Sequence, residues 1–307
     1  MEVFFLILLN VVLPVFLLIA AGVLLHRKFK FDMSTLSKLN TYFLMPSVGF
    51  VNIYQNNIGG ESLVHIIGFL VIQCTCLMII SAVISKAAKF DSGLSSTFKN
   101  SIVLNNAGNF GLPVSQLVFQ HNPLGASIQI VVMIFQNLLT YTYGLFNSVS
   151  VDQRGFKALK EFLKNPVIYA FLLGLILHSC HVKIPPFIWT PIHNASNAFL
   201  AVALVTLGAQ SAYIKISRFS LPLFLSLFGR LLLSPLIAMF IITTLNLEGT
   251  TAQALFIASS FPTSRNSALF ALEYGNHPEY AAQVVLMSTI LSMITVTTFV
   301  YLSTILF

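Results

Sequence analysis

Apolar segments of about twenty residues follow one another along the whole chain, and this pattern restricts its folds more than any other feature. A membrane-spanning helix needs about 20 mostly apolar residues. Hydrophobic residues make up 56% of the 307 residues and charged residues only 8%, against about 25% in soluble domains. So few charges cannot cover a soluble surface, which excludes a cytosolic enzyme, a nucleic-acid-binding protein and a disordered chain. We expect an all-α polytopic membrane protein.

Ten ranges are apolar enough to be membrane-spanning helices. They are 3–25, 34–54, 62–85, 96–119, 124–148, 165–181, 187–212, 219–244, 249–273 and 279–305. Polar residues, Gly or Pro interrupt 96–119 and 249–273, and 165–181 is short. The first range is expected to remain as a helix, because Arg27 and Lys28 follow it, whereas a cleavable signal peptide begins with its basic residues.

Basic residues gather in alternate loops. Twelve of the sixteen Lys and Arg lie in or beside the loops after the first, third, fifth and seventh ranges. Cytoplasmic loops carry an excess of Lys and Arg. We therefore expect a multi-pass protein of the cell membrane, with these loops in the cytoplasm and both termini outside.

The two halves of the chain resemble each other. Residues 14–26 and 166–178 share a Pro-Val start, a central Gly and a Leu-His end at a constant offset of 152 residues. Residues 129–133 and 283–287 match at an offset of 154. Because five is odd, a second five-helix copy enters the membrane from the opposite side, as in many secondary transporters. The expected units are a first five-helix repeat (1–150), a cytoplasmic linker (151–165) and a second, inverted five-helix repeat (166–307).

The fourth helix of each half contains residues that break helices. Three Asn, two Gly and one Pro fall within 105–113, and Pro262 stands among hydroxyl and amide side chains in 259–267. Unwound backbone at membrane depth is tolerated where it lines a cavity or is buried in protein. Transporters place their substrate site at such breaks. The candidate binding residues are Asn105, Asn106, Gly108, Asn109, Pro113, Pro262, Ser264, Arg265 and Asn266.

Arg265 is the residue that most sharply indicates a ligand. A buried membrane Arg costs at least a few kcal/mol and is usually functional or paired. Its guanidinium and the N-termini of the broken helices together describe an anion site. The alternative is a structural pair with Glu273. Arg230, within 219–244, is interpreted mainly as structural.

No catalytic or metal-binding pattern accompanies these motifs. The three cysteines form neither a disulfide framework nor a metal signature, and Cys74 and Cys76 point to different faces of one helix. We therefore expect no enzyme activity, no metal and no cofactor.

The two broken segments resemble the auxin efflux carrier family of bacterial permeases. The resemblance rests on Asn106-x-Gly108-Asn109-x-Gly111-Leu112-Pro113 and on Phe261–Ala268, with further support from Ser288–Ser292, and it covers essentially the whole chain. It implies ten transmembrane helices in two inverted five-helix repeats, in which helices 4 and 9 are broken and cross near the middle of the membrane. It also implies a dimer with an elevator-like motion. Arg265 departs from the plant members, so auxin specificity does not follow.

The resemblance implies bacterial substrates such as malate and malonate. We expect a secondary transporter that moves a small organic anion, a mono- or dicarboxylate, across the cell membrane by alternating access. Its partners would be the lipid bilayer and a second copy of the chain, without nucleic acid, and coupling to protons or sodium stays open. Two alternatives remain: a sodium-coupled organic-acid symporter of the bile-acid-symporter-like fold, and a membrane receptor or sensor that binds a small acid without moving it.

Overall fold

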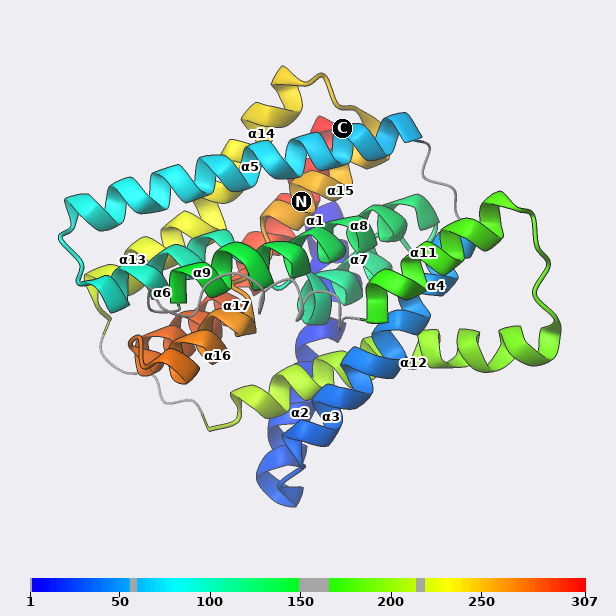
Figure 1. Ribbon diagram of the computed structural model, residues 1–307, viewed down its shortest axis with the longest axis horizontal. Coiled ribbons are helices and arrows are strands. Elements are labelled where there is room, and N and C mark those ends of the chain that lie inside the picture. Colours follow the sequence, from blue (N-terminus) through cyan, green and yellow to red (C-terminus); the bar gives the residue numbers. More distant parts are fainter. Residues whose placement is uncertain (1, 56–59, 149–165, 214–218) are drawn as a thin grey trace.

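The computed structural model describes residues 2–55, 60–148, 166–213 and 219–307 (Figure 1). The predicted linker 151–165 lies outside these residues. Throughout the described ranges the protein is helical and forms no strand, and a single isolated β-bridge joins Asn105 to Thr263. The prediction of an all-α protein is therefore confirmed.

Helices occupy each of the ten predicted ranges, and several contain a π-helical turn, labelled η. In the first half these are α1 (Glu2–Ile7), η1 (Leu8–Val12), α2 (Leu13–Phe29), α3 (Met33–Leu39), η2 (Asn40–Leu44), α4 (Met45–Gln55), α5 (Gly60–Ala87), α6 (Ser92–Val103), η3 (Ala107–Gly111), α7 (Leu112–Val118), α8 (Pro123–Leu139), η4 (Thr140–Gly144) and α9 (Leu145–Ser148). In the second half they are α11 (Pro166–Ser179), α12 (Pro186–Ser211), α13 (Leu221–Phe228), η6 (Gly229–Leu233), α14 (Ser234–Thr244), α15 (Gly249–Ser259), α16 (Arg265–Tyr274) and α17 (Pro278–Leu306).

Six of the described helices are long and apolar enough to cross a membrane. They are Phe4–Phe29, Ser62–Ala87, Pro123–Ser148, Pro186–Ser211, Leu221–Thr244 and Pro278–Leu306. Large apolar side chains on several of them face outward: Leu24 is 68% exposed and Phe240 72% exposed. Outward-facing apolar residues in this number suit lipid and not water, which supports a multi-pass membrane protein.

Local signals explain where the two broken helices stop and restart. The helix of the fourth predicted range ends with α6 at Val103 and resumes at Ala107, and that of the ninth ends with α15 at Ser259 and resumes at Arg265. Pro113 is the second residue of α7, which directly follows the π-helical turn η3, and its missing N–H interrupts the regular hydrogen-bond pattern there. Ser264 caps α16 by accepting a hydrogen bond from the Asn266 amide at 3.3 Å.

The helices form two groups: α4, α11 and α12 lie toward the right of Figure 1, and α6, α13, α16 and α17 lie toward the left. In the first group, which we call the α12 group, α2 and α4 pack against α12, and α11 packs against α4. The helices α2 and α12 approach very closely at two glycines. A Cβ atom on Gly22 would lie 2.1 Å from the Val205 carbonyl oxygen, and one on Gly208 would lie 1.9 Å from that of Ile19. Only glycine permits this backbone contact.

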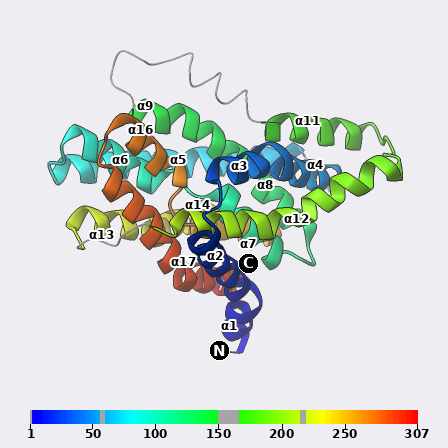
Figure 2. The ribbon, with the colours of Figure 1, turned by 90° about the horizontal axis from the view of Figure 1, so that it is seen from below.

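The second group, the crossover group, contains both broken helices. Here α5 packs against α6 and α14, and α15 packs against α8, α14 and α17. The helix α16 packs against α17 (Figure 2). The two chain ends meet in this region, where the Phe4 and Tyr301 rings lie 5.9 Å apart. The α12 group contacts the crossover group through α12 with η3 and α7, and through α4 with α8. The broken helices therefore lie next to the boundary between the groups.

Candidate functional site

The non-helical segments of the two broken helices run antiparallel and are joined by main-chain hydrogen bonds. The Asn106 amide donates to the Pro262 carbonyl oxygen at 2.8 Å, and the Ser264 amide donates to that of Leu104, also at 2.8 Å. The two donors, Asn106 and Ser264, are 158 positions apart, and so are the two acceptors, Leu104 and Pro262. The bridged pair Asn105 and Thr263 has the same offset. The two breaks are therefore equivalent parts of one crossing.

Two side-chain hydrogen bonds also join each broken segment to the other broken helix. Asn105 Nδ2 donates to the Ala258 carbonyl oxygen at the end of α15 at 3.3 Å, and Thr263 Oγ1 donates to the Ser101 carbonyl oxygen near the end of α6 at 2.8 Å. Each segment thus donates a side-chain hydrogen bond to a carbonyl group near the C-terminal end of the other broken helix.

Tight packing holds the restarted helices together. A Cβ atom on Gly111 would lie 2.6 Å from the Phe261 ring, which also packs edge-on against Phe110 with ring centroids 6.0 Å apart. Gln129 Nε2 donates to the Ala107 carbonyl oxygen at 2.8 Å, and Gln136 Oε1 accepts a hydrogen bond from the Asn105 amide at 3.4 Å. The polar face of α8 therefore forms hydrogen bonds to the segment where the fourth helix breaks and resumes.

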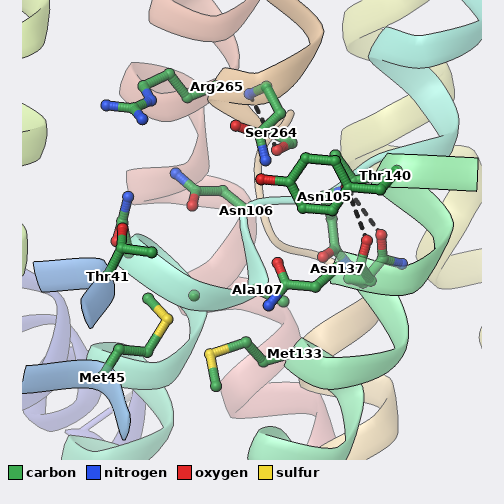
Figure 3. Close-up of a pocket in the computed structure, with 15 residues that line it drawn as sticks. Thr41, Met45, Asn105, Asn106, Ala107, Met133, Asn137, Thr140, Ser264 and Arg265 are labelled. Carbon is green, nitrogen blue, oxygen red and sulfur yellow. Dashed lines mark hydrogen bonds between the residues drawn. The ribbon is translucent and has the colours of Figure 1, made fainter. Parts of the chain in front are cut away.

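A polar cavity of about 110 Å³ lies beside the crossing (Figure 3). It is lined by Thr41, Met45, Asn105, Asn106, Ala107, Gly108, Asn109, Met133, Gln136, Asn137, Thr140, Tyr141, Ser264, Arg265 and Asn266. Arg265 is the charged residue of this lining, and none of these described residues is Asp or Glu. The first turns of η3 and α16 both contribute to the wall, so the positive ends of two helix dipoles border it. Such a cavity favours an anion.

Two buried amide atoms in the cavity wall lack hydrogen-bond partners among the described residues. They are Asn105 Oδ1 and Asn106 Nδ2, on side chains that are 7% and 6% exposed. The Asn105 amide cannot be turned to hide its oxygen, because its Nδ2 already donates to a carbonyl group. A buried polar atom without a partner costs about 1–3 kcal/mol. The wall therefore offers one acceptor and one donor to a ligand.

Arg265 stands at the boundary between the two groups of helices. The half-buried side chain donates from Nη1 to Ser37 Oγ at 3.3 Å, and Ser37 Oγ also accepts a hydrogen bond from Gln210 Nε2 at 3.2 Å. Arg265 also lines a second, mostly apolar cavity of about 800 Å³ between α3, α12, α16 and α17. The guanidinium thus lies where the polar cavity meets a wider one.

Seven of the nine candidate residues line the polar cavity: Asn105, Asn106, Gly108, Asn109, Ser264, Arg265 and Asn266. The two prolines do not. Pro113 is buried within α7, and Pro262 contributes its carbonyl oxygen to the crossing. The two prolines therefore lie at the interruptions of the helices, and their polar neighbours line the cavity.

The motifs in the sequence did not indicate five further lining residues: Thr41, Met45, Met133, Asn137 and Tyr141. Thr41 and Met45 come from the α12 group, and the others come from α8 and η4. For Asn137 there was a signal, an amide inside an apolar range beside Gln136 and Thr140. For the two methionines there was none, because an apolar residue in an apolar helix carries no mark of its direction.

The comparisons with known proteins agree with these observations. A model of the membrane transport protein family matches the chain twice, over residues 7–155 and 150–300. An uncharacterised transporter of Methanothermobacter thermautotrophicus is 27% identical over 269 residues, which are 86% of this chain and 86% of that protein. The chain therefore belongs to the membrane transport protein family, the family of the auxin efflux carriers that its two motifs resemble.

Proposed function

We propose that the protein is a secondary transporter for a small organic anion, a mono- or dicarboxylate such as malate or malonate. The observation that carries this proposal is the polar cavity at the crossing. Arg265 and two helix N-termini border it, and no carboxylate occurs among its described lining residues. An anionic ligand would be stabilised by the Arg265 charge and by both helix N-termini, and no negative side chain among these residues would repel it.

The size and the free atoms of the cavity narrow the class of acid. The cavity of about 110 Å³ is well below the roughly 300–1,000 Å³ of pockets that bind drug-sized ligands. A short-chain acid fits this space. Asn106 Nδ2 can donate to a carboxylate, but Asn105 Oδ1 needs a donor. The favoured substrate therefore carries a hydroxyl or N–H group beside its carboxylate.

The proposed architecture is ten membrane-spanning helices in two inverted five-helix repeats, 1–150 and 166–307. It is supported by the double match of one family model and by the reciprocal hydrogen bonds between the two breaks. The positions of the basic residues support cytoplasmic odd-numbered loops, with both termini outside the cell membrane. A homodimer completes the proposal.

Transport would proceed by movement of the crossover group against the α12 group. Thr41 and Met45 line the cavity from the α12 group, so such a movement uncovers it. The hydrogen bond from Arg265 to Ser37 crosses the same boundary and would break. The main-chain bonds of the crossing lie within the crossover group and would persist. The anion would thus move together with its binding groups, which is one form of alternating access.

The test is uptake of labelled lactate, malonate and malate into proteoliposomes by the wild type and by Arg265→Gln. A hydrogen bond to a charged group contributes about 1.5–3 kcal/mol, so Arg265→Gln should lower kcat/KM roughly 10- to 150-fold. Arg265→Lys keeps the positive charge but loses the planar, bidentate guanidinium. Its kcat/KM should lie between those of the wild type and Arg265→Gln.

Arg27→Gln is the matched control. Arg27 Nε and Nη2 donate to the Ala212 carbonyl oxygen at 3.1 and 2.9 Å, away from the cavity lining. This variant should transport like the wild type. Equal losses in Arg265→Gln and Arg27→Gln, or uptake unaffected by Arg265→Gln, would refute the assignment of the cavity as an anion site.

A further inference from the structure

Arg230 connects the ends of both broken helices. It lies in η6 and is 1% exposed. Its Nη1 donates to the Ile102 carbonyl oxygen at 2.9 Å, in the last turn of α6. Its Nη2 donates to the carbonyl oxygen of Ser259, the last residue of α15, and to Ser234 Oγ at 2.6 Å. One guanidinium therefore binds the C-terminal ends of two half-helices.

The charge on these ends explains why a cation is held there. The C-terminus of a helix carries a partial negative charge of roughly half an elementary charge. Two such ends meeting at one point are balanced by about one positive charge. Ser234 Oγ also donates to the Ser259 carbonyl oxygen at 2.9 Å. Gln73 Nε2 in turn donates to Ser234 Oγ at 3.3 Å, which orients the hydroxyl.

Acidic side chains do not supply this balance. Among the described residues, no Asp or Glu forms a salt bridge with Arg230. The atoms that accept hydrogen bonds from the guanidinium are carbonyl and hydroxyl oxygens, which are also the ligands of Na⁺ and Ca²⁺ in proteins. In transporters with broken helices, the C-terminal ends and unwound carbonyls coordinate Na⁺ or H⁺. The surroundings of Arg230 thus have the chemistry of a cation site.

We propose that Arg230 is a tethered cation that occupies the position of a coupling ion, so that the protein needs no Na⁺ to assemble its crossing. The positive charge is part of the chain and is present in every state of the transport cycle. A bound ion would enter and leave with the substrate, whereas the guanidinium stays. Arg230 is accordingly a positioning residue for the polar cavity, whose lining does not include it. This inference does not depend on which anion is carried.

The experiment compares thermal unfolding of the purified protein in NaCl and in choline chloride at equal ionic strength. The wild type should unfold at the same temperature in both salts. In Arg230→Ser the carbonyl groups lose their cation and the deleted side chain leaves room for an ion. Sodium at 100 mM should therefore raise the unfolding temperature of this variant by about 2–4 °C over choline.

Two further variants separate this role from simple packing. Arg230→Lys retains a charge and should unfold at the same temperature in both salts. Arg265→Ser also removes an arginine but leaves the carbonyl ends covered, so sodium should have no specific effect on it. A structural role alone would lower the stability of Arg230→Ser equally in either salt.

The proposal is overturned if sodium stabilises the wild type over choline, or if folded Arg230→Ser responds equally to both salts. If Arg230→Ser cannot be purified in folded form, Arg230→Gln takes its place in the same comparison. The readout is unfolding and not transport. Failure of the proposed anion transport would instead appear as uptake independent of Arg265, so the two failures are distinguishable.

Discussion

The polar cavity should distinguish a 2-hydroxy acid from the same acid without its hydroxyl group. Asn105 Nδ2 already donates to the Ala258 carbonyl oxygen, so Asn105 Oδ1 remains as a buried acceptor without a partner among the described residues. Lactate and malate carry a hydroxyl that can donate to this oxygen. Propionate and succinate have the same carboxylates and no such donor.

The size of the preference follows from the burial of Asn105, which is 7% exposed. A ligand that covers the acceptor without donating to it leaves a polar atom desolvated and unpaired, at a cost of about 1–3 kcal/mol. At 1.4 kcal/mol per factor of ten, the hydroxy acid should have a kcat/KM roughly 5- to 150-fold above that of its analogue.

The assay is competitive uptake into proteoliposomes, with lactate against propionate and malate against succinate. In Asn105→Leu the ratio within each pair should fall to about one, even if total uptake is also lower. Asn137→Leu, which changes another amide of the same cavity lining, should preserve the ratio. A wild-type ratio near one, or a ratio lost in Asn137→Leu and kept in Asn105→Leu, would refute the reasoning.

Three other perturbations test the surrounding structure. Ser37→Ala removes the acceptor of the Arg265 hydrogen bond, worth about 0.5–1.5 kcal/mol, and should speed amide hydrogen exchange in α16 by roughly 2- to 12-fold. Gly208→Ala would place Cβ 1.9 Å from the Ile19 carbonyl oxygen and should cost about 1–3 kcal/mol of stability, whereas Gly68→Ala, with no atom within 4 Å, should cost nothing; equal unfolding temperatures would contradict the close helix contact. The Leu94 amide donates to the capping Asp91 and lowers the pKa of this carboxyl, so its stabilisation is present at neutral pH and is lost as the pH falls below about 4; Asp91→Ala should lose about 1 kcal/mol at pH 7, and the gap to the wild type in thermal unfolding should shrink towards pH 3.

The positions of the breaks could be predicted because their cause is local. Asn, Gly and Pro within 105–113, and Pro262 with its polar neighbours, disfavour a continuous helix whatever surrounds them. The structure interrupts the helices at 104–106 and 260–264, inside or beside these segments. The same residues also suggested the polar lining, since amide side chains at membrane depth need partners.

The remaining parts of the site depend on contacts between distant segments and could not be predicted. Thr41 reaches the polar cavity only because α4 packs beside α8. Arg230 was interpreted as structural because its neighbours Phe228 and Gly229 reveal nothing. Its three hydrogen-bond partners, Ile102, Ser234 and Ser259, lie on three separate helices. No pattern within one segment indicates that those ends meet.

The crossing is held largely by main-chain atoms, and this has a consequence for how such proteins diverge. The bonds from the Asn106 amide to Pro262 and from the Ser264 amide to Leu104 would form with almost any side chains at those four positions. Substitutions that alter the lining therefore leave the main-chain bonds between the two broken helices intact. One scaffold can exchange lining residues during evolution without having to rebuild the crossing that positions them.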